Sequence, residues 1–200
     1  MIHKHLALES SPHYTFEQFK LLDNSQRATY TAYLTNLYQT DKQSLKTIIQ
    51  STGFLTLDNS QIESLDLTPF QGITDLNLDK YNLQSLEHIQ QLTQLKSLHL
   101  QGCQNLQSLE GLQALTQLKS LHLHGCQNLL SLESLQALTQ LNSLSLSGYQ
   151  NLHSLEILQA LTQLNSLYLQ GCQNLQFLEG LQDLTQLHIN STWMSKLTIS

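Results

Sequence analysis

The sequence is short of charge, contains no valine and has no long apolar segment. Only 12% of its 200 residues are Asp, Glu, Lys or Arg, about half of the roughly 25% that is usual in soluble proteins. The absence of a continuous apolar run of about 18 residues excludes a membrane-spanning helix. A low charge combined with an alphabet dominated by Leu, Gln, Asn, Ser and Thr indicates a repeated template.

Cysteine is also scarce, and its use bears on the expected compartment. The chain has three cysteines, and its first residues, MIHKHLALESSPHYTFEQ, lack the apolar core of a secretory signal. Three cysteines without such a signal suit a reducing cytoplasm better than a disulfide framework. We therefore expect a cytoplasmic protein. Transfer into a host cell by a machine that reads no N-terminal signal stays open.

Charge is distributed unevenly along the chain. Residues 1–50 carry five Lys or Arg and four Asp or Glu, a net of +1, whereas residues 51–200 carry four Lys and eleven Asp or Glu, a net of -7. Nucleic-acid binding depends on basic groups that neutralise phosphate, so an acidic array argues against it. The same charge argues against binding to an anionic membrane surface.

Self-comparison gives a clear repeat. Units of 23 residues cover 95–117, 118–140, 141–163 and 164–186, and the first of them reads LKSLHLQGCQNLQSLEGLQALTQ. Two degenerate units precede them at 52–72 and 73–94, and a truncated unit follows. The pattern LxxLxLxGCxNL resembles the leucine-rich repeat, whose units have about 20–29 residues. The resemblance covers about three quarters of the chain and implies an α/β solenoid.

The residues of one unit support this fold independently. In Leu98-His99-Leu100 the apolar residues alternate, which predicts a short half-buried strand. Further along, Leu106, Leu109 and Leu112 recur every third residue, which suits a 3₁₀ or irregular return. Stacked units therefore predict a curved array with a parallel concave sheet of about seven short strands and an irregular convex side.

Both ends of the chain depart from the repeat. Residues 1–51 predict a helical N-terminal cap, with helices from Thr15 to about Leu22, from a cap at Ser25 to about Gln39, and from a cap at Asp41. These helices are expected to cover the first repeat, with a separate tyrosine-rich binding motif as the alternative. The repeats span 52–186. Residues 187–200 form a truncated last repeat that Trp193, Met194, Leu197 and Ile199 are expected to close.

Several residue columns of the template are interpreted as scaffold. Cys103, Cys126 and Cys172 are spaced by multiples of the repeat, unlike the close pairs of zinc sites, and predict small buried side chains. The asparagines are expected to bond to loop backbone, and the serines before each Leu-Glu to act as caps. The glutamates are expected near the start of each return segment, where the local dipole favours them, with a binding role as the alternative. The glutamate column consists of Glu87, Glu110, Glu133, Glu156 and Glu179.

Candidate binding residues are the strand positions where the template is broken. The strand centres and their neighbours two residues away should point into the concave face, with His188 in the central column. Aromatic and histidine side chains would anchor a partner protein, and the aspartates would steer a basic edge on it. The predicted partner-binding residues are Phe54, Asp58, Asp75, Asp79, His99, Gln101, His122, His124, Tyr168, Gln170 and His188.

The predicted function is therefore that of a non-enzymatic binding module, monomeric alone and without cofactor. The alternative is a metal-binding or enzymatic site on His99, His122 and His124, since three histidines can hold a metal. The GCQNL loops resemble plant resistance-protein repeats, and the short Gln- and Asn-rich array resembles leucine-rich-repeat effectors of intracellular bacteria. That resemblance implies an effector, or a regulator that binds and inhibits a companion effector enzyme.

Overall fold

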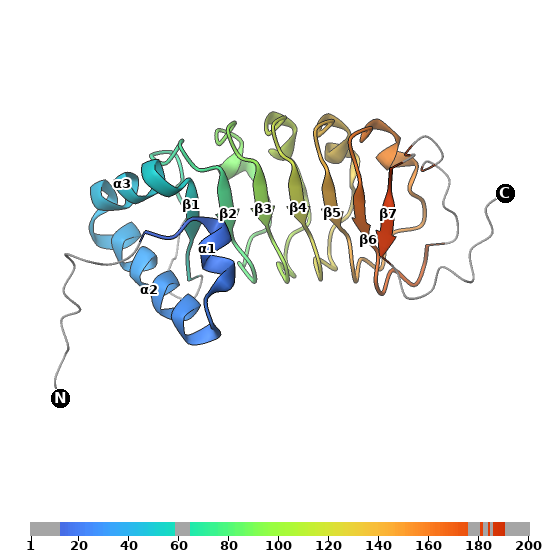
Figure 1. The fold of residues 1–200 in the computed structure, drawn as a ribbon. Coiled ribbons are helices and arrows are strands. Elements are labelled where there is room, and N and C mark those ends of the chain that lie inside the picture. The colour runs from blue at the N-terminus through green and yellow to red at the C-terminus, as the bar shows by residue number, and fades with distance from the viewer. Residues whose placement is uncertain (1–12, 59–64, 176–180, 182–183, 185, 191–200) are drawn as a thin grey trace.

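The protein is an array of stacked repeats with helices at its N-terminal end (Figure 1). The computed structural model describes residues 13–58, 65–175, 181, 184 and 186–190. Among the described residues, no helix combines the length and apolarity needed to cross a membrane. Trp193, Met194, Leu197 and Ile199, expected to close the last repeat, lie outside the described residues, as does Glu179.

One parallel sheet runs the length of the array, and its strands follow one another in chain order. Each strand has three residues and pairs with the strand of the next repeat. This confirms the predicted sheet of about seven short strands. The strands are β1 Phe54–Thr56, β2 Asp75–Asn77, β3 Ser97–His99, β4 Ser120–His122, β5 Ser143–Ser145, β6 Ser166–Tyr168 and β7 His188–Asn190.

A ladder of inward side chains fixes how the strands align. Leu98 pairs with Leu121, Leu121 pairs with Leu144, and all three are fully buried. Burial of each such side chain contributes about 1.5 to 3 kcal/mol relative to leaving it in water. Because side chains alternate along a strand, a slip of one residue would expose the whole ladder. The ladder therefore determines which residues reach the concave face, the name used here for the opposite face of the sheet.

The return segments form short 3₁₀ turns on the outer side. Leu109, Leu112 and Leu115 are buried there, because residues three apart lie on one side of a 3₁₀ helix. Two serines, Ser131 and Ser154, accept hydrogen bonds from the N–H of the glutamate two residues later, at 3.1 and 3.2 Å. The 3₁₀ helices are η3 Glu87–Ile89, η4 Leu112–Ala114, η5 Glu133–Ala137 and η6 Glu156–Ala160.

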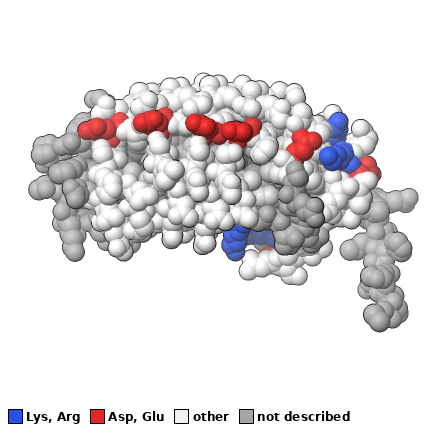
Figure 2. Space-filling model, turned by 180° about the vertical axis from the view of Figure 1, so that it is seen from behind, with Lys and Arg blue, Asp and Glu red and all other residues white. Residues whose placement is uncertain are grey.

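The glutamates that start these turns are exposed on the outer face of the array. Seen from behind, acidic side chains form a row along the repeats, and no basic side chain lies between them over most of its length (Figure 2). The described members of the glutamate column are Glu87, Glu110, Glu133 and Glu156.

Between the strand and the return segment, cysteines and asparagines connect successive repeats. Cys126 and Cys172 are fully buried, and their thiols donate to the Leu100 and Leu146 carbonyls, each at 3.1 Å. Burial raises the pKa of Cys126 to about 11, which keeps it an unreactive thiol. Asn128 and Asn174 donate to the Gln104 and Gln150 carbonyls of the preceding repeat. The scaffold interpretation of both columns is confirmed, although the asparagines themselves lie exposed in the loops.

Three helices precede the sheet: α1 Phe16–Leu21, α2 Asn24–Thr40 and α3 Lys42–Thr52. Thr15 and Asp41 cap α1 and α3 as predicted. The predicted cap of α2 at Ser25 is wrong, because Asp23 forms a reciprocal capping box with Gln26 and the helix begins two residues earlier.

The helices cover the first repeat in two different ways. Leu34 of α2 and Leu45 and Ile48 of α3 are buried with the first strand, so these helices close the end of the apolar core. In contrast, α1 lies in front of the first strands, on the concave face (Figure 1). The sequence predicted the cover but not this second position.

The junction between helices and sheet depends on Gly53. It ends α3 in the left-handed region, with φ of +67°, and a Cβ added there would lie 2.3 Å from Oγ1 of Thr74. That hydroxyl donates to Asp75 at 2.7 Å and also lies 3.2 Å from the Gly53 carbonyl oxygen. Gly53 thus combines a left-handed conformation, which glycine adopts without strain, with a close approach to the next repeat.

Replacing Gly53 by Ala should lower the free energy of unfolding by about 1 to 2 kcal/mol, through left-handed strain and displacement of Thr74. Urea denaturation followed by circular dichroism measures the change. Gly72→Ala is the matched control, since its added Cβ would have only the Ile49 side chain within 4 Å, at 3.9 Å, and should change stability little. Equal stability of Gly53→Ala and wild type would contradict this account of the junction.

Candidate functional site

The concave face consists of side chains at matching positions of successive strands. The first column runs from Phe54 through Asp75 to Ser166, and the central column from Thr56 through His99 to Tyr168. The predicted place of His188 in the central column is wrong: His188 pairs with Ser166, and Asn190 stands beside Tyr168. The reason is the inward ladder, because Ile189 must align with Leu167.

Helix α1 covers the N-terminal part of this face. The rings of Phe16 and Phe19 lie 5.4 and 5.0 Å from the ring of Phe54, which is fully buried. Phe54, one of the predicted partner-binding residues, is therefore covered by α1 and does not lie on the accessible part of the face. A phenylalanine at an outward strand position would expose apolar surface, and α1 removes that surface from water.

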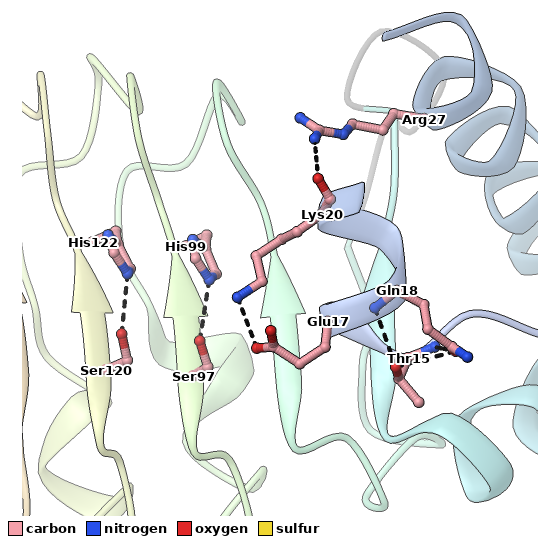
Figure 3. Close-up of polar contacts among 9 residues, drawn as sticks. All are labelled: Thr15, Glu17, Gln18, Lys20, Arg27, Ser97, His99, Ser120 and His122. Atoms are coloured by element: carbon pink, nitrogen blue, oxygen red, sulfur yellow. Dashed lines mark hydrogen bonds and ion pairs between the residues drawn. The ribbon is translucent and has the colours of Figure 1, made fainter. Parts of the chain in front are cut away.

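Contacts with α2 hold α1 in this position. The guanidinium of Arg27 donates to the Lys20 carbonyl at the end of α1 and lies 5.9 Å from the Phe19 ring (Figure 3). The Tyr14 backbone N–H donates to the Tyr30 hydroxyl at 3.2 Å. The first bond satisfies a carbonyl that the six-residue helix leaves open at its C-terminal end, and the second connects the residue before its N-cap to α2.

The predicted acidic residues lie at the covered end, and they are partly buried. Asp79 accepts a hydrogen bond of 2.8 Å from the Gln101 N–H, and burial raises the pKa of its carboxyl group. Asp75 accepts from the Thr74 hydroxyl at 2.7 Å, and the N–H of Asp58 donates to Thr35 of α2. Asp79 and Asp75 thus take part in bonds within the sheet and its loops.

Two of the three predicted histidines form a stack that continues from α1. The rings of His99 and His122 are nearly parallel, with centroids 4.4 Å apart, and the Phe16 ring lies 4.5 Å from that of His99. Each imidazole bonds through Nε2 to the serine two residues earlier on its own strand, Ser97 at 3.1 Å and Ser120 at 3.0 Å (Figure 3). The aromatic cover of α1 therefore extends over β3 and ends at β4.

Burial determines the protonation state of this stack. It lowers the pKa of His99 to about 3, with further contributions from His122 and Lys20, and it also lowers the pKa of His122. Both imidazoles are neutral at pH 7, which avoids repulsion between the stacked rings and with the Lys20 ammonium group.

This geometry does not support a serine–histidine nucleophile, although the Ser–His distances are short. A base with a pKa of about 3 takes up a proton too weakly at neutral pH to activate a hydroxyl group. The neighbouring serines also recur at the same strand position in four repeats, as Ser97, Ser120, Ser143 and Ser166. The pairs are therefore interpreted as structural.

His99, His122 and His124, the alternative metal site predicted from sequence, are also not arranged to hold a metal ion. In stacked rings the Nε2 atoms point side by side toward their own serines and do not converge on one position. Over the described ranges, no three His, Cys, Asp or Glu side chains are placed to hold one ion. The histidine cluster predicted from sequence is thus an aromatic stack with His124 beside it.

Beyond the stack, the concave face is open. Tyr168 is partly exposed, and His124 and His188 are exposed. Gln170 is hydrogen-bonded within the surface: it accepts from the Ser147 hydroxyl at 2.6 Å and donates to Asn190 at 2.8 Å. The open part of the face, called the open surface below, lies on β4 to β7.

Sequence reasoning missed the contribution of α1 to this face. Phe16 and Lys20 lie against the strands, and Leu21 at the end of α1 is 88% exposed. The Thr15 capping box signalled the helix but carried no information on where it packs. Phe54, an apolar residue at an outward strand position, was the one available signal that another element covers these strands.

The stack generates a pH prediction. Because the pKa of His99 is about 3 in the folded protein and 6.5 in an unfolded chain, its contribution to stability is complete above pH 6.5 and declines as pH falls toward 3. Its slope is at most about 1.4 kcal/mol per pH unit. Between pH 7.5 and 5, wild type should therefore lose about 2 kcal/mol more than His99→Gln in urea denaturation. Parallel losses in both proteins would show that His99 is not held neutral.

Comparison with known proteins agrees with this architecture. Residues 71–198 match the family model described as a BspA type leucine rich repeat region, in six copies. No curated protein matches the sequence significantly. Solved structures with the same fold include an internalin of Listeria monocytogenes, inlF, at 24% identity and a TM-score of 0.56, covering 76% of this chain and 44% of the internalin.

Two further structures are similar over the same region. The functional domain of InlJ from Listeria monocytogenes, which includes a cysteine ladder, has 20% identity and a TM-score of 0.53, over 72% of this chain and 37% of that one. A leucine-rich-repeat protein of Leptospira interrogans has 20% identity and a TM-score of 0.53, over 74% and 44%. The chain thus spans less than half of each of these relatives. Since the family model covers more than half of its length, the chain belongs to the BspA-type leucine-rich-repeat family.

Proposed function

We propose that the protein binds a partner protein on the open surface of β4 to β7. The observation that carries this proposal is the division of the concave face, with α1 and the ring stack over its first strands and partly exposed Tyr168 beyond them. Leucine-rich-repeat arrays are typically binding modules without enzymatic activity, and they use extended concave surfaces for it.

Small side chains make up the middle of the open surface. On β5 this face carries only Ser143, Ser145 and the following Ser147, between His122 on β4 and Tyr168 on β6. Ser145 and Ser147 are buried, so Tyr168 is the large side chain that a partner would reach there. Tyr168 supplies apolar area with a polar end, the combination typical of interface anchors.

Helix α1 sets the N-terminal limit of this surface. Its Lys20 lies beside the ring stack and forms an ion pair of 2.7 Å with Glu17 (Figure 3). We therefore move the predicted contact away from Asp75 and Asp79 and toward His124, Tyr168 and His188. A basic edge of the partner would not meet the aspartates there, because their region is the covered one.

We further propose that the protein acts as an adaptor or inhibitor, either in the bacterial cytoplasm or after transfer into a host cell. A rigid surface without a formed catalytic site suits binding that blocks or recruits a companion protein such as an effector enzyme. The resemblance to effectors of intracellular bacteria supports this role.

Affinity capture with matched variants tests the proposed surface. Tyr168→Ala should weaken binding of a captured partner about 30-fold, since loss of a central aromatic anchor costs about 2 kcal/mol. His124→Ala should weaken it less. Gln140→Ala, at an exposed position outside the strands, is the control and should bind like wild type. Undiminished binding by a folded Tyr168→Ala, His124→Ala double variant would rule out this surface.

A further inference from the structure

A depression of about 260 Å³ lies outside the sheet, between the return segments of units 118–140 and 141–163. Leu130, Leu132, Tyr149, Leu152 and Ile157 supply its apolar lining. Leu130 is 77% exposed, one of two large hydrophobic side chains with high exposure among the described residues. A single exposed leucine is ordinary on a protein surface, but one that extends an apolar depression forms a contiguous patch typical of an interaction site.

Two of the apolar residues of this depression are departures from the repeat. Leu130 stands where the neighbouring units have Gln107 and His153, and Ile157 stands where the two preceding units have Gly111 and Ser134. The fold therefore does not need an apolar side chain at either position. Both departures lie against one depression, so the apolar character is local and not a property of the template.

Charge distinguishes the partner that fits here. Glu133 lines the depression, and it belongs to the exposed acidic row on the outer face (Figure 2). Glu110 and Glu156 occupy the equivalent positions of the preceding and following units. Successive repeats of the array are about 5 Å apart. A second copy of this chain, with a net charge of -6, would be repelled by the row, whereas a basic segment would be attracted.

We propose that this depression and the three glutamates beside it form a second docking surface, for a basic segment of a partner protein that inserts one large apolar side chain next to Leu130. Lysine or arginine residues on either side of that side chain would lie against Glu110, Glu133 and Glu156. This surface lies outside the sheet, so it is independent of the open surface and of the function proposed there.

The test uses the full chain and a defined probe, a short fluorescent peptide rich in Lys with one central Trp. Binding is measured by anisotropy at low and physiological salt. The variant Leu130→Gln, Ile157→Ser installs residues found at the same positions of neighbouring units, so its fold should be retained, as circular dichroism checks. It should bind at least about tenfold more weakly than wild type. Glu133→Gln, Glu156→Gln should also weaken binding and flatten its salt dependence.

Leu21→Gln is the control, because it removes the other highly exposed leucine, and it should bind like wild type. Equal peptide binding by wild type and Leu130→Gln, Ile157→Ser would overturn the proposal, since attraction to acidic groups alone would then explain it. A dimer in sedimentation that Leu130→Gln dissociates would also overturn it, in favour of a second copy as the occupant. A Tyr168→Ala variant that binds the peptide normally would support two separate surfaces.

Discussion

Burial of one inward leucine per strand is the constraint on which the rest of the structure depends. Leu98, Leu121 and Leu144 pair in register, and this alignment fixes which side chains emerge on the concave face and which enter the loops. It also tolerates variation elsewhere. Tyr149 replaces a cysteine in the loop column, and its hydroxyl reaches the Leu129 carbonyl at 3.1 Å. Leu167 and Ile189 are 22 residues apart, whereas the earlier leucines are 23 apart, and yet their alignment is kept, so His188 changes column.

The second constraint is the aromatic contact between α1 and the sheet. Phe16 and Phe19 cover Phe54, and the stack of Phe16, His99 and His122 carries the cover across β3. This packing requires neutral imidazoles and thereby removes the basicity that a catalytic general base would need. The same contacts that stabilise the N-terminal end therefore also leave β4 to β7 as the open part of the concave face, where we propose that a partner binds.

The repeated elements were predictable because the same residue pattern recurs in successive units. Strands, 3₁₀ returns and buried cysteines follow from spacing alone, and the helix-capping residues Thr15 and Asp41 are local signals. The position of α1 was not predictable, since Phe16 meets Phe54 and His99 through tertiary packing far apart in sequence. For this reason Phe54 is a candidate residue that α1 covers, while His124 and Tyr168 remain at accessible positions. Leu130 and Ile157 were overlooked because each is a single departure in one unit, and only the fold brings them together.

Hydrogen exchange of the free protein and of its complex with a captured partner tests the central claim most directly. If α1 leaves β4 to β7 as the binding surface, the partner should slow exchange of the amides in residues 143–147 and 166–170. It should leave residues 75–79, under the N-terminal cover, unchanged. Slowed exchange confined to residues 75–79, or accompanied by faster exchange in α1, would contradict the account, because the partner would then displace the helix and bind the covered strands.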